Sequence, residues 1–125
     1  MFEFHDDMPV SRQEQFYLLM LIGLLESFEN NAISSTDLCV WGLRNQTQYY
    51  FDKATQNPRL RLLAERAADI QTFCRCFPNM LEDYVERLKI DAMNELKNHY
   101  YYPTEYTHEG YELIVPMISF VDKKA

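Results

Sequence analysis

Apolar residues recur at helical spacing through most of the chain. Residues 16–28 are apolar on nearly every side and predict a central buried helix. A shorter helix is expected from Leu38 to Leu43. Two further stripes advance in steps of three and four, which is the period of an α-helix. The first consists of Leu60, Leu63, Ala67, Ile70, Cys74 and Phe77, and the second of Leu81, Tyr84, Val85, Leu88, Ala92, Leu96 and His99. The pattern therefore predicts a mainly α bundle of about four helices.

Polar residues mark where these helices start. Side-chain oxygens at such positions accept hydrogen bonds from backbone amides that the first helical turn leaves unpaired. The sequence offers this chemistry at four places, namely Ser11 with Glu14, Ser34 to Asp37, Asn57 before Pro58, and Asn79 with Glu82. Gly23 weakens the first helix, and the close approach of another helix is the expected reason for it.

The two ends of the chain differ from the helical part. Residues 111–115 are rich in β-branched residues and predict a strand. Pro116 interrupts it, and residues 117–121 return to an extended apolar pattern. We expect a short C-terminal strand or extended segment, and a loosely ordered N-terminal segment over residues 1–10. Residues 1–125 form one domain on this interpretation.

The charge of the chain argues against direct binding to nucleic acid. Nineteen acidic and twelve basic residues give a net charge of −7, whereas proteins that bind phosphate backbones are normally basic. The acidic surplus lies in residues 1–57, with eight acids and three bases, and in residues 79–125, with nine acids and five bases.

Three cysteines form no recognisable metal or disulfide motif. Cys74 and Cys76 are separated by one residue instead of the two of redox and zinc motifs, and Cys39 stands alone. We expect reduced cysteines on helices, with no disulfide pair, no metal and no cofactor. His5-Asp6-Asp7 would supply metal ligands only if adjacent residues near a terminus converged on one ion.

The sequence contains no motif of a known catalytic class. Its three glycines exclude a phosphate-binding glycine loop, and the short serine-hydrolase and zinc-protease signatures are absent. Catalysis would need a pocket in which His99 or His108 meets a carboxylate or Cys74. We expect a protein that is not an enzyme.

The longest apolar run, residues 16–25, has half the length that a membrane-spanning helix needs, which is about twenty residues. The residues before it are acidic, unlike the basic start of a signal peptide. We therefore expect a cytoplasmic protein without membrane contact.

Acidic and tyrosine-rich positions point to a protein-binding surface. Five of the nine tyrosines lie between Tyr100 and Tyr111, and acidic residues are interleaved with them. Exposed tyrosine supplies contact area at low entropic cost, and complementary charge speeds association. The candidate partner-binding residues are Glu82, Asp83 and Glu86 on the fourth helix and Glu105, Tyr106 and Glu109 in the tail. A solvated acidic face that merely keeps the protein soluble is the alternative interpretation.

In these physical features the chain resembles the immunity proteins of bacterial polymorphic and contact-dependent toxin systems. Residues 21–28, with Ile33-Ser34-Ser35 after them, also resemble short bacterial helical families. The first resemblance implies a stoichiometric antitoxin that binds a toxin domain, often a nuclease, and covers its basic active site. A self-associating helical adaptor or regulator is the alternative, in which the apolar helix over residues 16–28 forms a homodimer interface.

Overall fold

The computed structural model describes residues 2–4, 9–41, 56–101 and 118–120. The described part is a mainly α bundle, as the hydrophobic pattern predicted. Its elements are β1 (Phe2–Phe4), α1 (Val10–Glu29), α2 (Ser35–Trp41), α4 (Pro58–Ala68), α5 (Ile70–Cys76), the 3₁₀ turn η1 (Pro78–Met80), α6 (Leu81–His99) and β2 (Ile118–Phe120).

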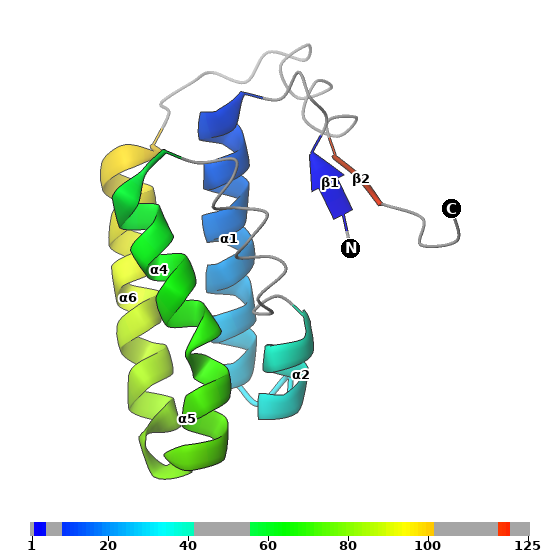
Figure 1. Ribbon diagram of the computed structural model, residues 1–125, viewed down its shortest axis with the longest axis vertical. Coiled ribbons are helices and arrows are strands. Elements are labelled where there is room, and N and C mark those ends of the chain that lie inside the picture. The colour runs from blue at the N-terminus through cyan, green and yellow to red at the C-terminus, as the bar shows by residue number, and fades with distance from the viewer. Residues whose placement is uncertain (1, 5–8, 42–55, 102–117, 121–125) are drawn as a thin grey trace.

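The long helices α1 and α6 lie side by side, α4 packs against α6, and α5 extends α4 toward the start of α6 (Figure 1). The short helix α2 packs against α1 and α5. β1 and β2 form an antiparallel pair in which Phe2 is opposite Phe120 and Phe4 is opposite Ile118. β2 falls within the segment expected to be extended, whereas residues 111–115, expected to form a strand, lie outside the described residues. Of residues 1–10, expected to be loosely ordered, Phe2–Phe4 form β1 and Val10 begins α1.

The core is the apolar interior shared by these helices. Its largest fully buried side chains are Leu18, Leu21, Leu25, Leu38, Leu60, Ile70, Val85 and Leu88. Each predicted stripe thus supplies residues to one continuous cluster. None of the helices in the described part is long and apolar enough to cross a membrane.

Two of the four expected helix starts have the predicted chemistry. Ser34 Oγ accepts from the Asp37 amide at 3.1 Å, and the Ser34 amide donates to Asp37 Oδ2 at 3.4 Å. Asn57 caps α4, because its Oδ1 accepts from the Arg59 amide at 3.0 Å, and Pro58 occupies the first helical turn.

The other two starts were predicted wrongly. α1 begins at Val10 after Pro9 and has no side-chain cap, because the carboxylate of Glu14 turns into the bundle instead. Asn79 lies in η1, and α6 likewise starts without a side-chain cap.

The predicted third helix is divided in two at Asp69. The break is slight, since the Asp69 amide donates to the Glu65 carbonyl at 3.1 Å and the Asp69 carbonyl accepts from the Phe73 amide at 3.2 Å. Both are the i to i−4 bonds of an α-helix, so the apolar stripe passes through the break and still reaches Ile70 in the core.

α1 is not buried on all sides, which corrects the prediction of a central helix. Leu19 is 52% exposed. Gly23 is also exposed, and apart from its chain neighbours and the backbone of α1 itself, a methyl group placed there would meet no described atom within 4 Å. Close helix approach therefore does not explain this glycine, which lies on the solvent side of α1.

Candidate partner-binding surface

The solvent-facing side of the α1–α6 pair is the candidate surface. The two helices run antiparallel, and two contacts define their register. Lys89 Nζ of α6 donates to Glu26 Oε2 of α1 at 2.6 Å, and Gln15 Nε2 of α1 donates to the Tyr100 carbonyl at 3.1 Å. Between these contacts each helix presents a row of residues at steps of four and three, which places the row on one face. The rows are Gln15, Leu19, Ile22 and Glu26 on α1 and Lys89, Met93, Leu96 and Tyr100 at α6.

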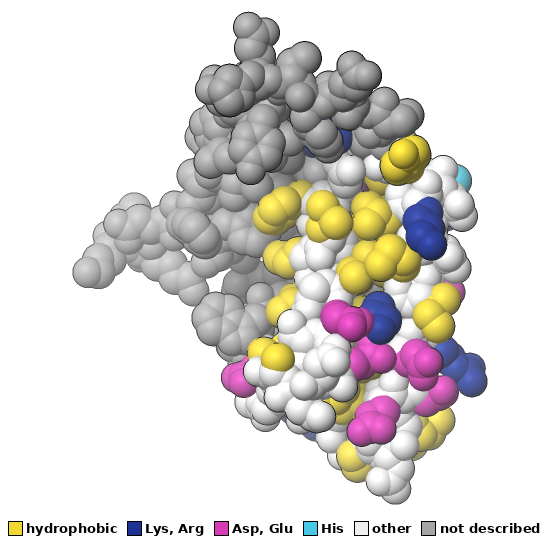
Figure 2. All heavy atoms as spheres, turned by 180° about the vertical axis from the view of Figure 1, so that it is seen from behind, with side chains coloured by type: hydrophobic (Ala, Val, Ile, Leu, Met, Phe, Trp, Pro, Cys, Tyr) yellow, Lys and Arg dark blue, Asp and Glu magenta, His cyan; other side chains and the backbone are white. Residues whose placement is uncertain are grey.

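The middle of this surface is apolar. The helical register sets Ile22 across from Met93 and Leu19 across from Leu96, and Ile90 lies beside Met93 on the outer side of α6. Leu19 is 52% exposed and Ile90 is 49% exposed, whereas Ile22 and Leu96 reach partly into the core. Figure 2 shows apolar side chains gathered mainly on the upper half of this face. We call Leu19, Ile22, Ile90, Met93 and Leu96 the apolar strip.

Acidic residues occupy one end of the same surface. The last turn of α1 meets the first turns of α6 there, and Figure 2 shows acidic side chains around a basic one. Lys89 bridges two carboxylates of α1, with 2.6 Å from Nζ to Glu26 Oε2 and 2.7 Å to Glu29 Oε1. Hydrogen bonds from Lys89 and Asn30 lower the pKa of the Glu26 carboxyl, and those to Glu26 and Glu29 raise the pKa of Lys89. We call Glu26, Glu29, Glu82, Asp83 and Glu86 the acidic end.

The predicted binding residues divide into two groups. Glu82 and Glu86 are exposed and precede Lys89 by seven and three positions, so they continue its row along α6. Asp83 is also exposed, faces farther round the helix, and pairs with Arg87 at 3.1 Å. Glu105, Tyr106 and Glu109, predicted to bind with them, lie outside the described residues.

A buried polar cluster lies at the opposite end of α6. Two carboxylates are nearly inaccessible there, Glu14 at 7% and Glu95 at 8% exposure. Glu95 Oε1 accepts from Arg59 Nε at 3.0 Å and from Asn57 Nδ2 at 3.3 Å. The Tyr100 hydroxyl donates to Glu14 Oε2 at 2.9 Å and accepts from Asn57 Nδ2 at 2.6 Å. These bonds tie α1, the start of α4 and the end of α6 together, and we call the five residues the buried polar cluster.

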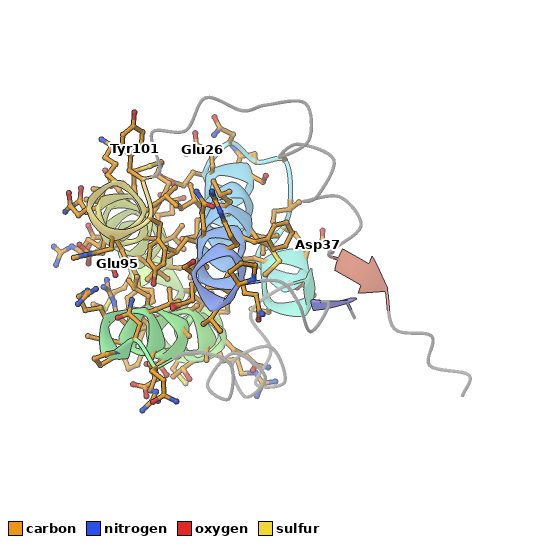
Figure 3. All side chains as sticks on the ribbon, turned by 90° about the horizontal axis from the view of Figure 1, so that it is seen from above. Glu26, Asp37, Glu95 and Tyr101 are labelled. Atoms are coloured by element: carbon orange, nitrogen blue, oxygen red, sulfur yellow. The ribbon has the colours of Figure 1, made fainter. Side chains whose placement is uncertain are left out.

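The cluster favours the neutral form of its tyrosine. Burial raises the pKa of the Tyr100 phenol. The hydrogen bond from Asn57 lowers this pKa and the hydrogen bond to Glu14 raises it, so burial decides the direction. In the view along the helices, Glu95 lies on the α4 side of α6, whereas Glu26 and Tyr101 lie on the side away from α4 (Figure 3). Glu95 and the acidic end therefore lie on different sides of the helix pair, and Tyr100 belongs to both parts, because its carbonyl accepts from Gln15 and its hydroxyl lies in the cluster.

The expected position of His99 on the core stripe is wrong. Its side chain is exposed, and its Nε2 lies 3.8 Å from Glu95 Oε2. Glu95, one turn earlier on α6, is the buried residue at this end of the helix. Cys74 lies on α5 near the first turn of α6, and His99 ends that helix of 19 residues. A helix of this length spans about 28 Å, so the pair cannot act together.

Sequence reasoning missed several residues that the fold brings together. Glu26 and Glu29 join the acidic end through contacts with Lys89, which is 63 positions from Glu26. Glu14 was predicted to cap a helix with Ser11, and Glu95 was not singled out, although it falls on the buried stripe of α6 by its spacing from Leu88 and Ala92. Cys39 and Cys74 also meet, with 3.7 Å between their sulfur atoms.

In the residues that the structure describes, no group of three or more metal-ligating side chains gathers at one place. His5, Asp6, Asp7 and His108, considered above as ligands or a general base, lie outside these residues. Comparison of the chain with protein-family models, with curated proteins and with solved structures gives no match in any of the three.

Proposed function

We propose that this protein is a stoichiometric inhibitor that binds a toxin domain with a basic active site, of the nuclease kind. The observation that carries the proposal is the surface on which the acidic end adjoins the apolar strip. Protein interfaces commonly combine an apolar centre with a polar and charged rim. A surface of this chemistry fits a partner on which lysines and arginines surround an apolar patch.

The mechanism assigns different tasks to the two parts of the surface. The carboxylates of the acidic end pair with basic side chains that would otherwise hold phosphate, and they speed the encounter. Leu19 and Met93 supply apolar contact area in the centre of the interface. Because both residues lie on helices that the core holds in place, their backbone loses little conformational entropy on binding.

Association kinetics with the toxin domain test this proposal. Glu86→Lys should slow association about tenfold at low salt, and the difference should shrink as salt screens the charges. Leu19→Ala should mainly accelerate dissociation. Glu65→Lys and Leu62→Ala are matched controls, because both residues are exposed on α4, away from the α1–α6 surface.

Inhibition supplies the second measurement. The toxin domain should lose its activity at one equivalent of this protein, and the Glu82→Lys/Glu86→Lys double variant should inhibit only at higher concentration. Association that ignores salt, with full binding by charge-reversed variants of both Glu82/Glu86 and Glu105/Glu109, would contradict the electrostatic mechanism. Binding without loss of toxin activity would contradict the inhibitor.

A second candidate function is self-association, which the exposure of Leu19 and Ile90 favours. An adaptor of this kind would bury the apolar strip against a second copy. Sedimentation equilibrium separates the two candidates, because the inhibitor is expected to be monomeric alone. A dimer that Leu19→Asp dissociates would support the adaptor.

A further inference from the structure

The thiols of two cysteines on different helices are in contact. Cys39 of α2 and Cys74 of α5 are 35 positions apart in sequence, and their sulfur atoms are 3.7 Å apart. Both residues are partly buried against the core. α2 packs on α5, so the pair lies in an interface between two helices.

We propose that Cys39 and Cys74 form a dithiol site that closes to an intramolecular disulfide by exchange with a small-molecule disulfide such as oxidised glutathione. A disulfide has a sulfur–sulfur bond of about 2.05 Å, so the two sulfurs need to approach by less than about 2 Å. Rotation of the two side chains can share this movement. The pair lies between α2 and α5, outside the α1–α6 face, and its chemistry does not depend on the identity of a protein partner.

The exchange proceeds in two displacements. The thiolate of one cysteine attacks the small-molecule disulfide, forms a mixed disulfide and releases one equivalent of small-molecule thiolate. The second cysteine, as its thiolate, attacks the protein sulfur of the mixed disulfide and expels the second equivalent. The two protons lost by the cysteines end on the two released thiols, so the protein is oxidised by two electrons and the reagent is reduced by two.

The surroundings of Cys39 determine when the exchange is fast. Burial raises the pKa of the Cys39 thiol to about 11, and its hydrogen bond with Cys74 contributes in the same direction. Because the thiolate is the reactive form, the rate of closure should rise as the pH is raised.

Cys76 provides the internal control. It is exposed near the end of α5, two positions beyond Cys74. Residues two apart on a helix do not face each other, so Cys76 should not replace either member of the pair.

Peptide mapping by mass spectrometry after incubation with oxidised glutathione tests the site. The folded Cys76→Ser variant should lose two hydrogens and yield a peptide that links Cys39 to Cys74. The wild type should yield the same linked peptide, and its exposed Cys76 should carry only a mixed disulfide with glutathione. Cys39→Ser should stop at a mixed disulfide with glutathione. Thermal unfolding should show a Tm higher by about 10 °C in the bridged wild type than in the reduced protein, because the bridge restricts the unfolded chain.

Two results would overturn the site. One is a bridge that maps to Cys76 or joins two molecules, or the absence of any bridge after prolonged oxidation of the folded chain. The other is a lower Tm in the bridged protein, which would show that the folded chain must open before Cys39 and Cys74 can join.

Discussion

The two ends of the α1–α6 pair contain the same kinds of charged residue in opposite surroundings. At the acidic end, Glu26 and Glu29 share Lys89 at the surface. In the buried polar cluster, Glu14 and Glu95 are almost covered and bond to Tyr100, Asn57 and Arg59.

This difference assigns different roles to similar carboxylates. A buried carboxylate needs nearly all its hydrogen bonds inside the protein, so removal of a partner is costly. An exposed carboxylate exchanges protein contacts for water at little cost, and its charge remains available to another molecule. The buried polar cluster should therefore contribute to stability, and the acidic end to recognition.

The apolar core that lies between the two ends should give the largest stability effect when it is truncated. Leu88 is fully buried midway along α6. Leu88→Ala should lower the free energy of unfolding by about 2–5 kcal/mol through lost burial and a residual cavity. Urea denaturation measures this, with exposed Leu62→Ala as the control. A loss below about 0.5 kcal/mol for Leu88→Ala would show that this face of α6 is not in the core.

The buried polar cluster should give an intermediate effect. Tyr100→Phe removes the hydroxyl that donates to Glu14 and accepts from Asn57. The free energy of unfolding should fall by about 1–2 kcal/mol at neutral pH, because buried groups lose a partner. The neighbouring residue Tyr101 is exposed, so Tyr101→Phe should change stability little.

The same variant should change the response to alkali. The pKa of Tyr100 is raised in the fold from an ordinary value of 10.0, so above that pH the unfolded chain releases its phenol proton first. Stability contributed by this group is present below pH 10.0 and falls as the pH rises further. The free energy of unfolding, measured between pH 8 and about pH 11, should therefore decline less steeply in Tyr100→Phe than in Tyr101→Phe. Equal slopes would mean that burial does not hold the Tyr100 phenol neutral.

The acidic end should give the smallest stability effect. Glu86 is exposed, and Glu86→Lys should change the free energy of unfolding by less than about 0.5 kcal/mol. The same substitution is expected to slow association with a basic partner, so the two measurements together separate folding from recognition. A large loss of stability in urea would place Glu86 among the structural carboxylates and remove the contrast between the ends.

Local chemistry made much of the bundle predictable. The stripes that contain Leu63, Ile70 and Leu88 follow the helical period, and Asn57 before Pro58 is a start signal whose geometry depends only on neighbouring residues. Capping was predicted wrongly at Ser11 because the Glu14 carboxylate has a distant and better buried partner, Tyr100.

The candidate surface was less predictable because it depends on the packing of separate helices. Glu82 and Glu86 could be recognised on one polar face of a helix, but no local pattern places Glu26 beside Lys89. Glu95 was missed for a related reason, since it occupies a core position by spacing and is accommodated there only through Arg59 and Asn57.

The acidic end also has a consequence for the order of the last turn of α1. Carboxylates favour the amino end of a helix, where backbone amides give a partial positive charge, and disfavour the carboxyl end. Glu82 and Asp83 lie at the favourable end of α6, whereas Glu26 and Glu29 lie at the unfavourable end of α1, whose last turn has no basic residue. Lys89 supplies the missing cation from another helix. The last turn of α1 should therefore fray when α6 is absent. In the intact protein, this turn and the part of α6 around Lys89 should open to hydrogen exchange as one cooperative unit.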